Sequence, residues 1–273
     1  MTFLARRWRN IAVTTVVAAF LYVAIATYDA ALLSGVHFSG WALLATTAVL
    51  AVHTVRKRVP MLPLGARAQW TQLHIYAGWL SVVLFVLHVG PRLPDGWLEG
   101  TLATLFAVVA GSGIVGLALS RRLPKRLSRR GEEVIFERIP AFRARLRNEA
   151  ETLVAESASA AQSSTICDFY ARRLAAFFAA PRNVAQHLLA SNRGLFALLA
   201  EIDERRRYLS ETERAYADSL RELVIRKDDL DFHFALQAAL KGWLFVHAPL
   251  TYGLLIVSLV HLVLVYAFGG GLG

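Results

Sequence analysis

The sequence predicts an all-α fold: a five-span transmembrane helical bundle with a cytoplasmic helical insert between spans four and five. Three observations lead to this prediction. Hydrophobic residues make up 56% of the 273 residues, and the mean hydropathy is +0.44, more apolar than a soluble domain usually is. Five uncharged apolar stretches approach the ~20 residues that cross a hydrocarbon core. The segment between the last two stretches is polar and has helical patterning.

Each apolar stretch supplies one membrane crossing. In order, the stretches are residues 11–28, 41–55, 70–89, 101–120 and 242–268. The second is the shortest, but no charge interrupts the chain from Ala30 onward, so we expect this span to begin near Phe38. The first follows MTFLARRWRN, and no clear small-x-small cleavage site comes after it. We therefore expect a retained first span and not a cleaved signal peptide.

Positive charge gathers on one side of the predicted spans and sets their orientation. The opposite loops, residues 34–40 and 90–100, contain Arg92 as their single basic residue. We therefore predict an integral protein of the bacterial cytoplasmic (inner) membrane, with the N-terminus and the insert cytoplasmic and the C-terminus external. The net charge of +10 then reflects topology and contact with membrane lipid, and we expect no nucleic-acid partner. The basic clusters are Arg6, Arg7 and Arg9; Arg56, Lys57, Arg58 and Arg67; and Arg121, Arg122, Lys125, Arg126, Arg129 and Arg130.

The chain divides into three segments. Residues 1–120 hold membrane spans one to four, residues 121–240 form the cytoplasmic helical insert, and residues 241–273 hold the fifth span and a short external tail. The clearest helix start in the insert is Ser210-Glu211-Thr212-Glu213, a capping box ahead of an amphipathic stretch. We expect this helix to continue through Phe234 into the fifth span as one long helix.

The rest of the insert is expected to be helical and without chemistry of its own. We expect helices at residues 141–161 and 166–179 and breaks at Pro181 and residues 191–194. No nucleotide-binding, flavin-binding or metal-binding motif occurs there. Its two histidines, His187 and His233, are isolated in the sequence and expected at a surface or interface. We interpret the insert as a helical cap or docking surface.

Two apolar spans carry paired histidines, in LHIYAGWLSVVLFVLH and VHAPLTYGLLIVSLVH. His74 and His88 are 14 residues apart, and so are His247 and His261. On an α-helix this spacing is about 3.9 turns, so both members of a pair point to nearly the same side, about 21 Å apart along the axis. Spans three and five cross in the same direction. The sequence therefore predicts His74 opposite His247 near the cytoplasmic face and His88 opposite His261 near the outer face.

Two facing imidazoles at each level favour a haem iron as their ligand. Ionisable groups are rare inside a bilayer unless they have a function. The single cysteine excludes a CxxCH haem attachment and a four-cysteine iron–sulfur site. Zinc or copper is disfavoured as the metal, because neither pair has a cysteine or a carboxylate nearby. We expect two haem b groups, an inner one on His74/His247 and an outer one on His88/His261, with Gly78 leaving room for a macrocycle. Four packing or headgroup-level histidines are the alternative.

A glycine motif on the fourth span has a structural interpretation. Gly111-Ser112-Gly113-Ile114-Val115-Gly116 fits G-x-G-x-x-G, but the dinucleotide motif requires a preceding strand and a soluble βαβ unit. In a membrane helix, small residues let a neighbouring helix or a bulky cofactor approach closely.

H-x13-H on two helices resembles the di-haem transmembrane cytochromes b. Two families share this pattern. One is the cytochrome b of quinol-oxidising complexes, in which Gly78 and Pro249 resemble the small and proline positions near the ligands. The other is the membrane domain of ferric reductases and NADPH oxidases, which has its histidine pairs on spans three and five. The resemblance implies haem and electron transfer. The chain departs from the reductases by ending after Phe268 without a flavin module, and from the quinol oxidisers by having Pro94-Asp95-Gly96-Trp97 and not Pro-Glu-Trp-Tyr. The large insert fits neither pattern.

Basic residues near the ligands are candidates for binding haem propionates. Arg67 and Lys241 precede inner ligands and Arg92 follows an outer one, with His37 as a possible companion of Arg92. Snorkelling or topology charges explain the same positions equally well. His53, at the inner end of span two, has either a role in quinone or proton handling or a structural role.

The function expected from these observations is that of an integral membrane di-haem cytochrome b. It would carry electrons between a cytoplasmic-side or quinone-pool donor and an external-side acceptor. The first alternative is a quinone-reactive membrane anchor subunit of a larger oxidoreductase, with a redox partner that carries c-type haem or iron–sulfur centres. The second is a membrane scaffold or sensor with a cytoplasmic helical docking domain.

Overall fold

The computed structural model describes residues 3–31, 34–56, 66–91, 94–128, 130 and 134–268. These residues form helices and no strand, which confirms the predicted all-α class. Predicted features at Lys57, Arg58, Arg92, Arg129 and in the tail after Phe268 lie outside the described residues.

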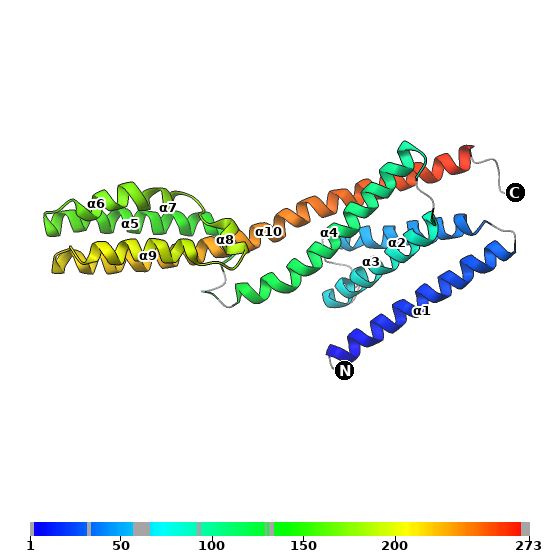
Figure 1. Cartoon of the computed structure of the whole chain (residues 1–273), viewed down its shortest axis with the longest axis horizontal. Helices are drawn as coiled ribbons and strands as arrows, with labels where there is room; N and C mark the ends of the chain where they lie inside the picture. The colour runs from blue at the N-terminus through cyan, green and yellow to red at the C-terminus, as the bar shows by residue number, and fades with distance from the viewer. Residues whose placement is uncertain are drawn as a thin grey trace. The chain divides into compact units, whose positions relative to one another are not determined.

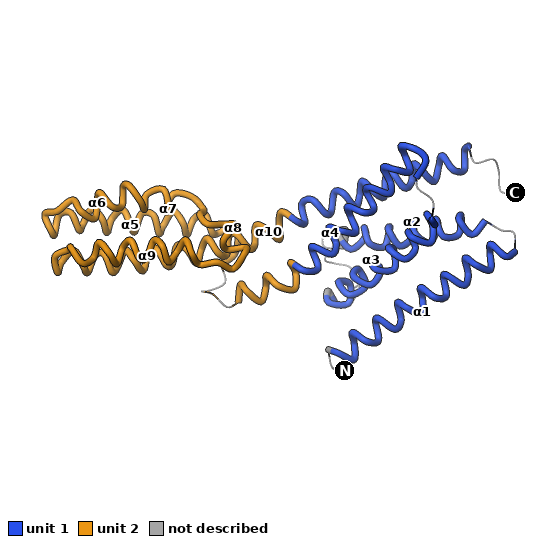
Figure 2. The backbone as a smooth tube through the Cα atoms, viewed as in Figure 1, with its two compact units in different colours: residues 1–118, 243–273 blue, residues 119–242 orange. Residues whose placement is uncertain are grey.

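The chain forms two compact units (Figure 2). Unit 1 contains residues 1–118 and 243–273, and unit 2 contains residues 119–242. Two helices, α4 (Trp97–Leu127) and α10 (Glu211–Phe268), contribute residues to both units.

Unit 1 holds the predicted membrane spans. Besides parts of α4 and α10, it consists of α1 (Phe3–Ala30), α2 (Gly35–Arg56) and α3 (Arg67–Val89) (Figure 1). All five helices are long and apolar enough to cross a membrane. This agrees with the predicted number of spans and with their apolar composition.

The surface of unit 1 is apolar and part of its interior is polar. Large hydrophobic side chains on α1 are open to the surroundings, with Val16 67% and Phe20 70% exposed. By contrast, the hydroxyl residues Ser39, Thr47 and Ser81 are buried, and each donates a hydrogen bond to a carbonyl of its own helix. The exposed apolar surface of unit 1 would be unfavourable in water and is suited to contact with lipid.

Contacts within unit 1 join its helices. The helices α1, α2 and α3 pack closely against one another. Asn10 donates to the Gln72 side chain at 2.8 Å, which links α1 to α3. The rings of Phe85 and Phe106 stack with centroids 4.1 Å apart and link α3 to α4.

Unit 2 is a helical assembly around one main core. Its helices are α5 (Ile139–Ala161), α6 (Thr165–Phe169), α7 (Ala175–Ala179), α8 (Val184–Leu188), α9 (Arg193–Arg206) and the first part of α10, with a 3₁₀ turn at Phe136–Arg138 and a π-helical turn at Tyr170–Leu174. The core buries Leu174, Phe178, Leu220 and Val224 almost completely. Figure 1 shows α6 and α7 alongside α5, against which both pack.

The expected start and length of the last helix are confirmed. Ser210 N–H donates to Glu213 Oε2 at 3.0 Å, and Glu213 N–H donates to Ser210 Oγ at 3.4 Å, which are the two bonds of a capping box. From there α10 runs without a break to Phe268, with Pro249 inside it.

The fourth helix is longer than the predicted span. The sequence places its end at Ser120, where charged residues begin, but α4 continues through Pro124 to Leu127. Burial explains the extension, because Leu123 and Leu127 pack in a second small core of unit 2, on Phe232 and Leu236.

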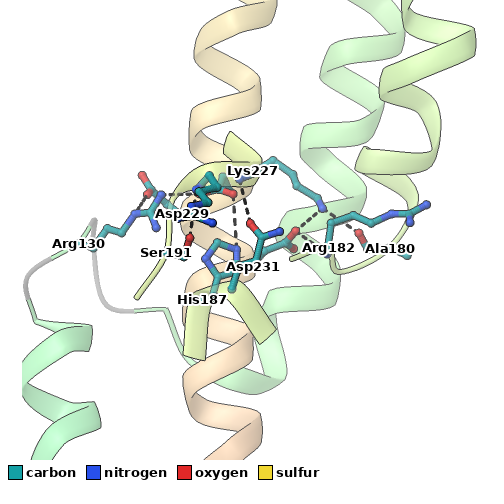
Figure 3. A network of polar contacts seen from close by, with 12 residues as sticks. Arg130, Ala180, Arg182, His187, Ser191, Lys227, Asp229 and Asp231 are labelled. Carbon is teal, nitrogen blue, oxygen red and sulfur yellow. Dashed lines mark hydrogen bonds and ion pairs between the residues drawn. The ribbon is translucent and has the colours of Figure 1, made fainter. Parts of the chain in front are cut away.

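Buried charges join α10 to the segments around it in unit 2 (Figure 3). Lys227 pairs with the Asp231 carboxylate four residues on, and both side chains are fully buried. Lys227 Nζ also donates to the Ala180 carbonyl at 2.8 Å, and Asp231 accepts the Arg182 N–H at 2.9 Å. Burial lowers the pKa of Lys227 and raises that of Asp231, while each partner's charge opposes the shift.

Candidate functional site

Two of the four predicted ligands meet directly in unit 1. The imidazoles of His74 on α3 and His247 on α10 have ring centroids 6.4 Å apart, and their planes are nearly perpendicular, at 81°. A metal ion bound by one nitrogen of each ring at about 2 Å would put the two centroids about 6 Å apart. The centroid distance is therefore compatible with two ligands of a single metal, and it also lies in the range of ordinary edge-to-face ring packing.

A serine and a tryptophan hold the His247 ring. His247 Nδ1 is hydrogen-bonded to Ser112 Oγ of α4 at 2.7 Å. The Trp243 indole stacks on the imidazole, with centroids 5.1 Å apart and planes at 21°. Trp243 Nε1 in turn donates to the Ser112 carbonyl at 2.8 Å. One turn of α4 thus fixes both the ring and its stacking partner.

The glycine motif of α4 makes this approach possible. A Cβ atom added at Gly113 would lie 3.7 Å from His247 Cε1, in ordinary contact. One added at Gly116 would lie 1.9 Å from Trp243 Cζ2, closer than any side chain allows. The predicted role of these glycines, close approach inside a membrane helix, is realised by a tryptophan and a histidine.

A third imidazole lies at the same level. The His53 ring of α2 is 4.8 Å from the His74 ring, centroid to centroid, with planes at 33°. The structure thus places His53 beside the inner pair, where the sequence left its role open.

The second predicted pair repeats the serine contact. His88 Nδ1 is hydrogen-bonded to Ser39 Oγ of α2 at 3.1 Å, and the backbone of Val36 is a further partner of the ring. A Cβ atom at Gly40 would lie 3.0 Å from His88 Cε1. His261 of α10 lies close enough to His88 to interact with it electrostatically.

The two pairings occur in the same order along α3 and α10. His74 meets His247, and His88, further along α3, has His261, further along α10, as a neighbour. The two helices therefore run in the same direction within unit 1.

Polar and aromatic side chains surround the second pair. The His37 and Tyr266 rings are in edge-to-face contact, with centroids 6.1 Å apart, and His37 is hydrogen-bonded to Ser34. Trp41 Nε1 donates to Tyr266 Oη at 2.9 Å, which joins α2 to the end of α10.

Of the other predicted cofactor-binding residues, the structure describes the surroundings of Lys241 and Gly78. Arg67 is the first residue of α3, but its side chain, like all of Arg92, lies outside the described part of the chain. Lys241 pairs with Glu137 and lies over the Phe136 ring, with Nζ 4.1 Å from the centroid. At Gly78 an added Cβ would meet no atom within 4 Å, so space is open beside α3 one turn after His74.

A metal site made by the protein alone is not apparent. Within the described residues, no three or more His, Cys, Asp or Glu side chains form a group that could hold a metal ion. Two imidazoles would leave the remaining coordination positions of a bound iron to another ligand. The nitrogens of a tetrapyrrole would fill them, so the residues present are compatible with haem.

The predictions from the sequence did not include the two serines, and they put two histidines in the wrong surroundings. Ser39-Gly40 and Ser112-Gly113 are the same dipeptide on two apolar spans, each beside a predicted ligand, and this repetition is the signal that could have identified them.

His187 and His233 were expected at a surface or interface, but both are buried in unit 2. There His187 Nε2 lies 3.5 Å from Asp228 Oδ1, and His233 Nε2 is 2.7 Å from the Arg130 carbonyl.

Comparisons of the chain with protein-family models, with characterised proteins and with solved structures find no match.

Proposed function

We propose that this protein is an integral membrane di-haem cytochrome b that carries electrons across the membrane. The observation that carries the proposal is the His74–His247 pair, whose perpendicular rings have centroids 6.4 Å apart. A second pair, His88 and His261, lies 14 residues further along both helices. Edge-to-face packing of two rings also gives such a centroid distance, but it does not account for two pairs with the same 14-residue spacing on two helices.

The residues of the chain have separate tasks in this function. His74 and His247 are the ligands of the inner haem, and His88 and His261 those of the outer haem. The haem supplies a one-electron couple when it is bound. The protein fixes the ligands, keeps the sites in a low-dielectric interior and sets the local charge, which together determine the redox potentials. Because two imidazoles would hold the iron at each level, no coordination position would be left for oxygen, which favours electron transfer over oxygen chemistry.

Two sites stacked along the helices suit transfer across a bilayer. The 14-residue spacing separates the levels by about 21 Å along the axis, so two short steps replace one long one. We place the inner level on the cytoplasmic side, following the basic clusters. The donor is then a cytoplasmic-side carrier or a membrane quinone. The acceptor is an external redox protein with c-type haem or iron–sulfur centres.

A haem count tests the proposal. The purified protein should give two b haems per chain by pyridine haemochrome analysis, with a reduced-minus-oxidised spectrum typical of bis-imidazole haem. His74→Ala and His261→Ala should each reduce the count to about one. His187→Gln, a histidine substitution in unit 2, should leave it at two. Absence of haem from folded protein made in haem-replete cells would contradict the proposal and favour the scaffold.

A further inference from the structure

Ser39 and Ser112 make the same pair of contacts on different helices. Ser112 Oγ donates to the Val109 carbonyl of its own helix at 2.8 Å and is 2.7 Å from His247 Nδ1. Ser39 Oγ donates to the Val36 carbonyl at 2.9 Å and is 3.1 Å from His88 Nδ1. Each hydroxyl thus lies between a backbone carbonyl and one ring nitrogen.

The two contacts together favour one position for the ring proton. A hydroxyl has one hydrogen to donate, and a carbonyl oxygen accepts only. If the serine hydrogen goes to the carbonyl, the serine oxygen accepts from the histidine, and the donor is Nδ1–H. A neutral imidazole with its proton on Nδ1 has its lone pair on Nε2.

We propose that Ser39 and Ser112 are positioning residues that hold His88 and His247 in the Nδ1–H tautomer and leave Nε2 as the ligand nitrogen. Each serine is followed by a glycine beside the same ring: a Cβ at Gly40 would be tight against His88, and one at Gly113 would be in ordinary contact with His247. The same Ser-Gly dipeptide thus serves one ligand at each level.

A consequence for redox chemistry rests on the proposed function. A hydrogen bond from the distal ring N–H of a metal-bound histidine makes it a more basic ligand, and a more basic ligand stabilises ferric over ferrous iron. Each serine therefore lowers the midpoint potential of its own haem. Loss of Ser112 should raise the potential of the inner haem alone, and loss of Ser39 that of the outer haem alone.

The tautomer can be measured without haem. Full-length protein labelled with ¹⁵N-histidine would be prepared in lipid nanodiscs, with and without haem. In the haem-free sample, the ¹⁵N shifts should show His88 and His247 as Nδ1–H tautomers, each assigned by the signal that its own substitution removes. Ser112→Ala should return His247 to the Nε2–H form that free histidine prefers. Ser39→Ala should shift His88 the same way but less completely, because the backbone of Val36 remains a partner of its ring.

Matched variants separate this role from a general effect on packing. Thr104 on α4 is exposed and makes the same type of bond, to the Gly100 carbonyl at 2.8 Å, so Thr104→Ala should change neither tautomers nor potentials. Ser112→Thr, which keeps the hydroxyl, should restore the Nδ1–H signal of His247. Unchanged ¹⁵N shifts in the alanine variants would overturn the inference. Correct tautomers in a protein that takes up no haem would uphold the serine role and refute the cytochrome.

Discussion

A lysine and an aspartate lie side by side in the core of unit 2, where an isolated charge is costly. Lys227 and Asp231 are one helical turn apart on α10 and have no exposed side-chain surface. Lys227 Nζ lies 4.1 Å from the centre of the Phe177 ring and also bonds the Ala180 carbonyl. The pair therefore holds the end of α7 and the segment after it against α10. Its contribution depends on both charges being present, because either one alone would be buried without compensation.

Removal of one partner should destabilise unit 2 strongly. We expect Lys227→Met to lower the free energy of unfolding by about 3–5 kcal/mol, since Asp231 would be left buried and unpaired. The measurement is denaturant unfolding of the full chain in detergent micelles, followed by circular dichroism.

Two variants check the cause. Lys227→Met combined with Asp231→Asn removes both charges but keeps an acceptor for the Arg182 N–H, and it should recover most of the loss. Arg206→Ala breaks the exposed pair of Arg206 with Asp218 and should cost less than about 1 kcal/mol. A double variant as unstable as the single one would refute the charge argument.

At the scale of elements, α4 depends on its glycines to different degrees. The Trp243 indole occupies the place where a side chain at Gly116 would be, whereas a Cβ at Gly111 would meet no atom within 4 Å. Both positions belong to the same motif on the same helix. They therefore form an internal comparison in which helix propensity is shared and packing differs.

We expect Gly116→Ala to lower stability by about 1–3 kcal/mol, because the added methyl group displaces the Trp243 indole and weakens its bond to Ser112. Gly111→Ala should be neutral or stabilising by up to about 1 kcal/mol, since alanine is the better helix former. Thermal unfolding in micelles measures both changes. Trp243→Leu should relieve the cost of Gly116→Ala, and equal melting temperatures for the two alanine variants would contradict the packing argument.

Hydrophobic patterning predicts which segments are helical, and less about what they touch. The apolar stretches and the capping box at Ser210 depend on local chemistry, so the sequence contains them. The end of α4 does not depend on local chemistry. Leu127 is buried against residues more than a hundred positions away, and this burial outweighs the tendency of the charged residues and Pro124 to end the helix. In the candidate site, the spacing of the histidines and the order of the spans together predict which histidines pair. The contacts of Ser112, Ser39 and His53 arise from how separate helices meet, which no local pattern encodes.

At the scale of the whole molecule, the distribution of charge predicts how the chain is inserted. The basic clusters flank one end of the spans, and the loops at the other end are poor in lysine and arginine. We therefore expect residues 34–40 outside and the insert inside. The orientation matters for the proposed function because it would decide which histidine pair faces the cytoplasm.

The single cysteine makes this orientation measurable. Cys167 is partly buried against the core of unit 2, and its Sγ donates to the Val154 carbonyl at 3.6 Å. Cys167→Ser keeps the size and the donor, so it should give a folded background without cysteine. Into it we would place Ser34→Cys, at the exposed start of α2, or Ser159→Cys, exposed on α5. In spheroplasts, a membrane-impermeant maleimide should label position 34 at once and position 159 only after permeabilisation. The reverse pattern would put the insert outside, and the His74–His247 level would then face the external partner.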